Sequence, residues 1–302
     1  MSPRILIIHN PVAGRRHGRR LSELLGMLAA EGLEVEVKPT TGRGHARETA
    51  RLAEGIDVIV AAGGDGTVNE IVDGLRAKPD GETLPSIGFL PLGTANVLAW
   101  ELGLPRTPKA LVRQIRQGRT LAVRPGIANG KRFVLMVSVG LDARAVAAVR
   151  GQVKRLLGGG AYVMAALRAL RQPSPPCTVR IGNATFQART VIVTRARRYG
   201  GPFVLAPDAG LETSALHIVM LQSSGLVATL RYGLALVMGR LHKLPDVVMS
   251  VADQVEIEGA AGDPVQMDGD VASVMPLSVS MDSRCVPFLV PERIYASARG
   301  EG

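Results

Sequence analysis

Three glycines surround an acidic side chain in the segment Ala62-Gly63-Gly64-Asp65-Gly66-Thr67-Val68-Asn69-Glu70, directly after the apolar run Val58–Ala61. Because glycine has no Cβ atom, the backbone there can approach a phosphate closely. A helix that begins near Thr67 would add its N-terminal amides as donors, and Asp65 would place a carboxylate where Mg²⁺ requires an oxygen ligand. A tight turn with a helix cap is the structural alternative, but the combination of residues favours a phosphate site.

A second turn of the same kind follows the next strand-like run. The segment Leu92-Gly93-Thr94-Ala95-Asn96 comes directly after Ile87–Pro91. Gly93 again permits a close approach, while Thr94 and Asn96 offer side-chain hydrogen bonds. Two adjacent strand ends that carry such turns can hold one nucleotide between them.

A third turn, Asn10-Pro11-Val12-Ala13-Gly14, follows the run Ile5–His9. It precedes a cluster of cations at Arg15, Arg16, Arg19 and Arg20. These side chains suit an anionic ligand, and a solvated face at the start of a helix is the alternative interpretation.

The elements that must position these turns alternate along the first 125 residues. Strand-like runs lie at Ile5–His9, Val35–Pro39, Val58–Ala62 and Ile87–Pro91. Segments with helical periodicity lie at Arg19–Glu31, His45–Glu54, Val68–Arg76 and Val97–Leu102. This alternation predicts an α/β domain with a parallel sheet, in which ligands bind at the carboxyl ends of the strands.

After about Arg124 the pattern changes to short strands separated by turns, which predicts a β-sandwich. The expected strands are Val134–Val139, Thr178–Ile181, Thr190–Thr194, His217–Leu221, Val247–Val251, Val255–Glu258 and Leu277–Met281. Two helical insertions are expected, near Gly160–Arg171 and Leu226–Gly239. We therefore expect a nucleotide-binding domain of residues 1–125, completed by residues 290–302, and a sandwich domain of residues 126–289.

Composition narrows the classes of partner. The net charge of +10 and the pI near 10.3 favour an anionic partner. Only 3% of the residues are aromatic, and no finger, basic-zipper or RNP-like pattern is present, so we expect no nucleic-acid partner. Cys177 and Cys285 carry no metal-ligand spacing and indicate free thiols in a reducing compartment. The best apolar run, Gly225–Gly239, is interrupted by Arg231, and no signal-peptide pattern is visible, so a cytoplasmic protein is expected.

Three motifs in this order and spacing, GGDGTVNE, PLGTAN and NPVAG, resemble the catalytic domain of the diacylglycerol kinase family. That family includes bacterial lipid kinases and, more distantly, sphingosine and ceramide kinases. The resemblance covers the whole chain, although its motifs are sharp only in the first hundred residues. It implies a nucleotide-binding α/β domain, a β-sandwich domain and an active site in the cleft between them.

The resemblance also implies roles for individual residues. Thr40 corresponds to a nucleotide-contacting threonine, and Asp65 would bind the Mg²⁺ that accompanies ATP and take part in catalysis. The nucleotide-binding residues predicted in this way are Asn10, Pro11, Val12, Ala13, Gly14, Thr40, Gly63, Gly64, Asp65, Gly66, Thr67, Val68, Asn69, Glu70, Gly93, Thr94 and Asn96.

In the expected sandwich domain, Val265-Gln266-Met267-Asp268-Gly269-Asp270 resembles the Asp-Gly-Glu segment that supplies the catalytic base in the family. The last acid is Asp270, one methylene shorter than the usual glutamate. Either Asp268 or Asp270 could take the proton from a lipid hydroxyl. An acidic hairpin turn is the structural alternative, since Asp-Gly is a favoured turn dipeptide.

A second departure from the family concerns a structural metal. Family members often carry an Asp-Asp-Gly-x-Leu segment that binds a structural Mg²⁺, whereas this chain has Thr213 for the metal-binding aspartate and Ser214 for the glycine. Glu212 or Asp208 would have to compensate. We do not expect this structural metal to be retained.

The expected function is that of an ATP-dependent lipid kinase, which transfers the γ-phosphate to a hydroxyl group of a membrane lipid such as diacylglycerol. An NAD-kinase-like enzyme, a kinase for another alcohol and a catalytically inactive nucleotide-binding regulator are the alternatives. The cations of the segment Ala145–Arg171 suit a peripheral contact with anionic lipid, and an ordinary packed helix explains them equally well. A homodimer is compatible with the sequence, which does not specify the oligomeric state.

Overall fold

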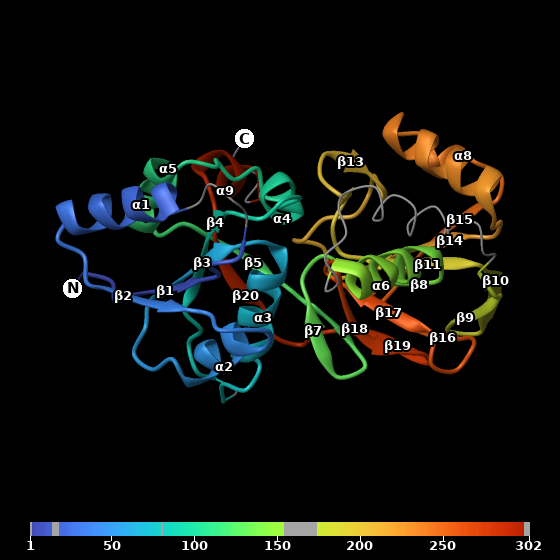
Figure 1. The fold of residues 1–302 in the computed structure, drawn as a ribbon, viewed down its shortest axis with the longest axis horizontal. Helices are drawn as coiled ribbons and strands as arrows, with labels where there is room; N and C mark the ends of the chain where they lie inside the picture. Colours follow the sequence, from blue (N-terminus) through green and yellow to red (C-terminus); the bar gives the residue numbers. More distant parts are fainter. Residues whose placement is uncertain (1, 14–17, 80, 154–173, 299–302) are drawn as a thin grey trace. The chain divides into compact units, whose positions relative to one another are not determined.

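The computed structural model describes residues 2–13, 18–79, 81–153 and 174–298. These residues form two compact units, which are shown in Figure 1. The first contains residues 1–125 and 283–302, and the second contains residues 126–282. Each unit is described separately below.

The first unit is built on a six-stranded sheet with the order β2-β1-β3-β4-β20-β5. Strands β1 to β4 and β20 are parallel, and β5 pairs antiparallel with β20. The strands are β1 (Ile5–His9), β2 (Val35–Pro39), β3 (Val58–Gly63), β4 (Ser86–Pro91), β5 (Thr120–Val123) and β20 (Val286–Leu289). The expected α/β domain with a parallel sheet is confirmed.

Helices cover both faces of this sheet (Figure 1). They are α1 (Gly18–Ala30), α2 (His45–Leu52), α3 (Asp65–Leu75), α4 (Val97–Glu101), α5 (Pro108–Gln117) and α9 (Glu292–Ala298). Helices α1 and α5 pack on one face, where Ile5, Ile7 and Leu24 belong to a shared apolar core. Leu6 and Ile8 point to the opposite face and are equally buried. A strand buried on both faces reads as a continuous apolar run, which is the pattern that identified β1.

Two boundaries differ from the expectation. Helix α3 begins at Asp65 rather than near Thr67. Strand β20 lies in the first sheet, between β4 and β5, so the chain returns to the first unit before residue 290. The run Val286–Leu289 is apolar like the sandwich strands before it, and only its pairing with β4 and β5 distinguishes it.

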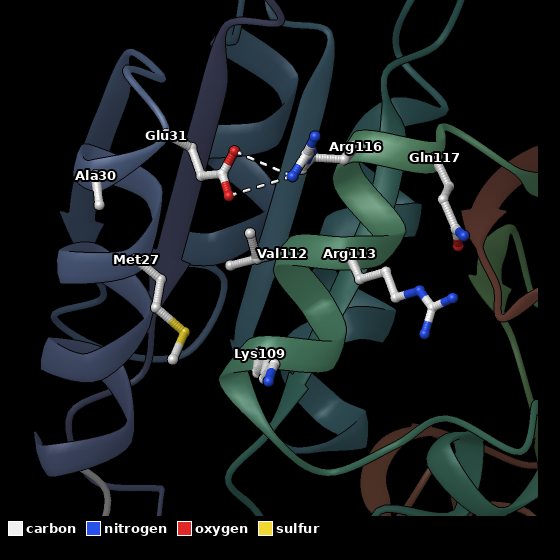
Figure 2. Close-up of a pocket in the computed structure, with 8 residues that line it drawn as sticks. All are labelled: Met27, Ala30, Glu31, Lys109, Val112, Arg113, Arg116 and Gln117. Carbon is white, nitrogen blue, oxygen red and sulfur yellow. Dashed lines mark hydrogen bonds and ion pairs between the residues drawn. The ribbon is translucent and has the colours of Figure 1, made fainter.

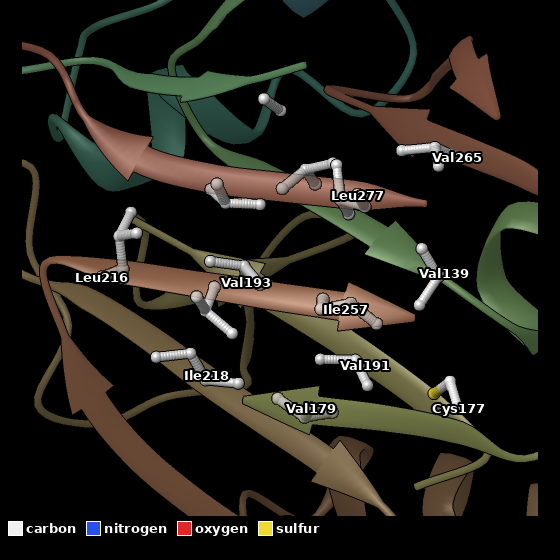
Figure 3. Packing of buried hydrophobic residues seen from close by; sticks show 14 of the residues in the cluster. Val139, Cys177, Val179, Val191, Val193, Leu216, Ile218, Ile257, Val265 and Leu277 are labelled. Atoms are coloured by element: carbon white, nitrogen blue, oxygen red, sulfur yellow. The ribbon is translucent and has the colours of Figure 1, made fainter. Parts of the chain in front are cut away.

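The second unit is a β-sandwich of two six-stranded antiparallel sheets, and this part of the expectation is also confirmed. One sheet has the order β10-β9-β16-β19-β6-β7: Ala184–Ala188, Cys177–Ile181, Gln254–Glu258, Leu277–Met281, Gly126–Ala128 and Lys131–Phe133. The other has the order β15-β14-β11-β8-β17-β18: Val247–Ala252, Leu216–Leu221, Thr190–Thr194, Met136–Val139, Pro264–Met267 and Asp270–Val274. Figure 3 shows the aliphatic core, in which Val179, Val191 and Ile257 interdigitate with no aromatic side chain among the labelled residues.

Smaller elements complete the second unit. A short ribbon pairs β12 (Arg198–Tyr199) with β13 (Phe203–Val204). The helices are α6 (Leu141–Val153), α8 (Leu226–Val237) and the 3₁₀ turn η1 (Leu241–Lys243). The helix expected near Gly160–Arg171 lies outside the described residues, as do most of the cations of that segment. Among the helices of the described residues, none is long and apolar enough to span a bilayer.

One ion pair of the second unit is buried. Arg132 on β7 and Asp282, directly after β19, are 2% and 5% exposed, and the Nε atom of Arg132 donates to the Asp282 carboxylate. When one partner of a buried pair is removed, the other charge remains in a low-dielectric interior without compensation, which typically costs about 3–5 kcal/mol. The pair joins the first strands of the unit to the point where the chain leaves it.

We predict that Asp282→Ala lowers the free energy of unfolding by about 3–5 kcal/mol, because the buried Arg132 guanidinium loses the carboxylate that it contacts. Urea denaturation measures this change. The matched control is Arg180→Ala, since Arg180 pairs with Glu258 on the surface of the same sandwich, where the two side chains are 46% and 53% exposed. An exposed pair contributes less than about 1 kcal/mol, so equal losses in both variants would refute the argument from burial.

Candidate active site

The predicted nucleotide-binding segments of the first unit meet at one edge of its sheet. In the parallel register, His9 lies opposite both Pro39 and Ala62, and Gly63 lies opposite Pro91. The residues that follow these positions therefore emerge side by side at the carboxyl ends of β2, β1, β3 and β4. They are Thr40, the turn after Asn10, the turn after Gly63 and the turn around Gly93.

The two glycine turns touch each other through their backbones. A Cβ atom on Gly93 would lie 2.7 Å from the Cα atom of Gly64, closer than such atoms approach in real proteins. The Leu92 and Gly93 amides donate to the Gly63 carbonyl oxygen, at 2.7 and 3.1 Å. Sequence reasoning assigned the glycines to the approach of a phosphate. The structure gives Gly64 and Gly93 an additional role, which is to let the two turns approach each other, while the missing side chain of Gly63 leaves room for Thr67.

The carboxylate of Asp65 joins the same two turns. Its Oδ2 atom accepts from the Val97 amide at 2.9 Å, and its Oδ1 atom accepts from the Leu98 amide at 3.0 Å. Asp65 thus begins α3 and at the same time caps the start of α4. Burial raises the pKa of the Asp65 carboxyl group above its usual value, and the amides of Leu98 and Val97 oppose that shift.

Two other predicted contacts also hold the scaffold. The side-chain amide of Asn96 closes the Gly93 turn, since its Oδ1 atom accepts from the Gly93 amide at 3.0 Å and its Nδ2 atom donates to the Gly93 carbonyl at 2.6 Å. The Glu70 carboxylate accepts from the amides of Gly44, at 2.8 Å, and Ala46, at 3.2 Å, at the start of α2. Both side chains therefore position neighbouring segments.

The remaining predicted residues divide by exposure. Val68 is 1% exposed and packs in the core, and Thr67 is buried against Gly63. The residues that are exposed or half-exposed at the edge of the sheet are Asn10, Pro11, Val12, Ala13, Thr40, Gly66, Asn69 and Thr94. Gly14, Arg15 and Arg16 lie outside the described residues, whereas Arg19 and Arg20 are exposed at the start of α1. At this edge the amides of Asp65 and Gly66 precede the first hydrogen bonds of α3, in which the Thr67 and Val68 amides donate to the Gly64 carbonyl at 3.0 and 3.3 Å.

The two acidic candidates of the second unit differ in their surroundings. Asp268 is 7% exposed and has a φ of 46°. Its carboxylate accepts three backbone hydrogen bonds, from the amides of Val134 at 2.8 Å, Leu135 at 2.9 Å and Met136 at 2.8 Å. These bonds explain why β8 begins only at Met136, although the apolar run starts at Val134.

Asp270 begins β18 on the other side of the turn and is half-exposed. The turn itself rests on a buried polar network. The Gly269 amide donates to the side chain of Gln266 at 3.3 Å, and Gln266 donates to Asp142 at 3.0 Å. The hydroxyl groups of Ser138 and Tyr199 donate to the same Asp142 carboxylate.

The sequence analysis missed the network around Asp142. Burial and the neighbouring negative charge of Asp142 raise the pKa of Tyr199 well above its ordinary value, so Tyr199 remains a donor. Ser138 lies only four residues before Asp142, but Tyr199 and Gln266 lie 57 and 124 residues after it. No local spacing pattern could have brought these two side chains to Asp142.

Within the described residues, no group of three or more acidic, histidine or cysteine side chains is placed to hold a metal. A single carboxylate suits a Mg²⁺ ion that takes its other ligands from nucleotide phosphates and water. Each Asp65 oxygen accepts one amide, and a carboxylate oxygen offers about two acceptor directions, so the site retains capacity for such an ion.

The first unit also has an open groove between α1 and α5, shown in Figure 2. An ion pair between Glu31 and Arg116 spans it, with a nitrogen-to-oxygen distance of 3.3 Å. Its lining residues are Met27, Ala30, Glu31, Lys109, Val112, Arg113, Arg116 and Gln117. None of the predicted site residues is among them.

Two family domains match most of the chain. Residues 4–127 match the diacylglycerol kinase catalytic domain, and residues 135–290 match the YegS C-terminal NAD kinase beta sandwich-like domain. The diacylglycerol kinase of Bacillus subtilis is 29% identical over 282 residues, which cover 90% of this chain and 91% of the relative. The diacylglycerol kinase of Staphylococcus haemolyticus is 27% identical, with 96% and 88% covered.

Solved structures agree at the level of the fold. A diacylglycerol kinase from Bacillus anthracis superposes with a TM-score of 0.75 at 23% identity, covering 97% of this chain and 98% of that one. An NAD kinase from Archaeoglobus fulgidus, solved in complex with ATP, gives a TM-score of 0.55 at 14% identity, with 98% of each chain covered. With both of its domains matched in order, the chain belongs to the diacylglycerol kinase family of lipid kinases.

Proposed function

We propose that this protein transfers the γ-phosphoryl group of Mg·ATP to a hydroxyl group of a membrane lipid, with diacylglycerol as the representative acceptor. The observation that carries the proposal is the pair of interlocked glycine turns at the carboxyl edge of a parallel sheet, in a chain whose two domains match the family. Phosphoryl transfer depends on positioning and on neutralisation of charge, and a rigid array of amides supplies both.

On the nucleotide side, the phosphates would lie against the first turn of α3. The amides there carry the positive end of the helix dipole, and Thr94 and Asn69 stand exposed or half-exposed nearby along the edge. Asp65 would hold Mg²⁺ through the acceptor capacity that its two amide bonds leave. Bound with ATP, the metal would neutralise charge on the phosphates.

On the acceptor side, Asp270 is the candidate base and Asp268 is its support. Three amides hold the Asp268 carboxylate inside the protein and stabilise its charge, so it is poorly placed to collect a proton from a substrate. Asp270 is half-exposed at the end of a turn that Gln266 and Asp142 fix from below. A carboxylate of this kind can orient the lipid hydroxyl and accept its proton.

The alternatives have weaker support. The likeness to NAD kinases rests on TM-scores of 0.55 and 0.58 at 14% and 11% identity, which is evidence for the fold alone. A catalytically inactive regulator would explain the shorter acidic side chain at position 270. Against it, the turn that precedes Asp270 is held by the hydrogen bonds of Gln266 to Gly269 and Asp142. A transfer assay distinguishes these readings directly.

Peripheral contact with a membrane is part of the proposal, and α8 is the described element that suits it. Its outward side chains Val227, Leu230 and Leu234 are 82%, 63% and 63% exposed and recur at helical spacing. An apolar stripe of this kind rarely faces water on a soluble monomer.

The charges around α8 favour an anionic lipid surface over a second protein copy as its partner. Residues 213–245 contain no aspartate or glutamate. Arg240 and Lys243 are exposed directly after the helix, while Arg231 pairs with Asp246. An acidic membrane attracts a protein in two ways, by burying apolar side chains and by binding cations. The apolar stripe and the exposed cations provide both, and each basic side chain contributes about 1 kcal/mol near the surface.

The function is tested by transfer of radiolabel from γ-labelled ATP to diacylglycerol, a sphingoid base, phosphatidylglycerol and NAD in parallel. We expect labelled lipid, and we expect Asp270→Asn to lower kcat by about 10²–10⁴-fold with ATP affinity retained, because only the proton acceptor is lost. Asp268→Asn should instead lower stability, since it disturbs three backbone hydrogen bonds. Labelled NAD, or no labelled product despite ATP binding, would contradict the proposal.

The role of Asp65 beyond its cap is tested by Asp65→Asn. We expect a loss of about 1–3 kcal/mol in stability, because an amide group cannot accept from both α4 amides, and a fall in kcat of about 10²-fold or more. Thr107→Ala, which removes the side-chain cap of α5 at a position without a predicted site residue, is the matched control. It should cost about 1 kcal/mol and leave kcat unchanged. Wild-type turnover by folded Asp65→Asn would exclude the metal assignment.

The membrane surface is tested by co-sedimentation with vesicles of phosphatidylcholine, with and without phosphatidylglycerol. We expect Leu234→Ser to weaken binding to acidic vesicles by about tenfold, since one leucine no longer contributes its apolar area. Leu52→Ser is the control, because Leu52 also lies on a helix and is 60% exposed, against 63% for Leu234. Equal binding by both variants, or a change of oligomeric state in Leu234→Ser alone, would reject α8 as the lipid-facing element.

A further inference from the structure

Arg195 is the largest side chain that is wholly buried in the described residues, at 0% exposure. It follows β11 directly, and its guanidinium group enters the loop of residues 205–215 between β13 and β14. The Nη1 atom donates to the Ala215 carbonyl at 2.6 Å and to Thr213 Oγ1 at 3.2 Å. The Nη2 atom donates to the Leu211 carbonyl at 3.0 Å and to the Thr213 carbonyl.

These contacts gather four oxygen atoms of one loop around a single cation. Converging carbonyl and hydroxyl oxygens are also the ligands of a hard divalent ion. Here the oxygens accept hydrogen bonds, and a divalent ion in the same place would meet the guanidinium charge at short range. The hydroxyl group of Thr213 is further engaged, since it donates to the Gly210 carbonyl at 2.8 Å.

The acids that would have to replace the missing metal ligand are turned to solvent. Glu212 and Asp208 are both exposed, and in the described residues no cluster of metal-ligating side chains includes them. The charge inside the loop is also felt by its neighbour His217, whose pKa is lowered by burial and then by the Arg195 cation. The residues present therefore do not fit a structural Mg²⁺ at this loop.

We infer that the guanidinium group of Arg195 is the structural cation of the 205–215 loop and takes the place of a divalent metal there. The loop is closed by a covalently attached charge that no chelator can remove. The inference concerns the folded chain alone and does not depend on the proposed reaction.

The first test uses the unaltered protein without nucleotide or lipid. We expect the midpoint of thermal unfolding to agree within about 1 °C in EDTA and in millimolar Mg²⁺, because an ion that binds only the folded state would raise it by mass action. A midpoint that falls by several degrees on chelation and recovers with added Mg²⁺ would overturn the inference. Because the readout is stability, failure of the kinase assay leaves this result unaffected.

The second test moves the charge. Arg195→Met should lower the midpoint by about 5 °C or more, since the loop carbonyls lose their donors inside the protein, whereas Arg197→Met, at the exposed neighbouring arginine, should leave it nearly unchanged. In Arg195→Ala/Thr213→Asp, a carboxylate joins the vacated carbonyls, and we expect Mg²⁺ to raise the midpoint by several degrees. A double variant that folds and does not respond to Mg²⁺ would show that these oxygens do not form a cation site.

Discussion

The hydrogen bonds between the Asp65 carboxylate and the first amides of α4 are the constraint on which the carboxyl edge of the first sheet depends. They tie the turn after β3 to the turn after β4, and a Cβ atom on Gly93 would collide with Gly64 of the other turn. The position of each turn therefore depends on the other. Amides that are already oriented can stabilise developing charge without the cost of reorienting. The glycine motif therefore has a structural function as well, which is to link the turns after two neighbouring strands.

Much of this architecture could be predicted from the sequence because short stretches of neighbouring residues determine it. A strand buried on both faces is a continuous apolar run, and a strand-to-helix turn is a cluster of glycines, as β1 and the turn at Gly63 show. The return of the chain to the first sheet was predicted at residue 290, after β20, because an apolar run of four residues does not indicate which strands it pairs with. The partners of Asp65 and Glu70 could not be predicted either, since the amides that they hold lie 24 to 33 residues away.

The second unit depends on buried charged side chains. Arg195 donates its backbone amide to the Leu135 carbonyl at 2.8 Å, and the Leu135 amide donates to Asp268. The closed loop, the start of β8 and the turn before Asp270 therefore form one connected structure. Such connections bring together residues as much as 134 positions apart, as Val134 and Asp268 are, which explains why spacing alone could not separate the surroundings of Asp268 from those of Asp270.

The acidic residues of the motifs differ in the number of backbone amides from which their carboxylates accept hydrogen bonds. Glu70 and Asp268 accept two and three amides and serve the fold. Asp65 accepts two amides at the carboxyl edge of the first sheet, where the proposed Mg²⁺ would use the acceptor capacity that these bonds leave. Asp270 follows a turn that Gln266 supports through the Gly269 amide. An acid that must exchange a proton has to keep an oxygen accessible, so the residues around it must take part in fixing its position.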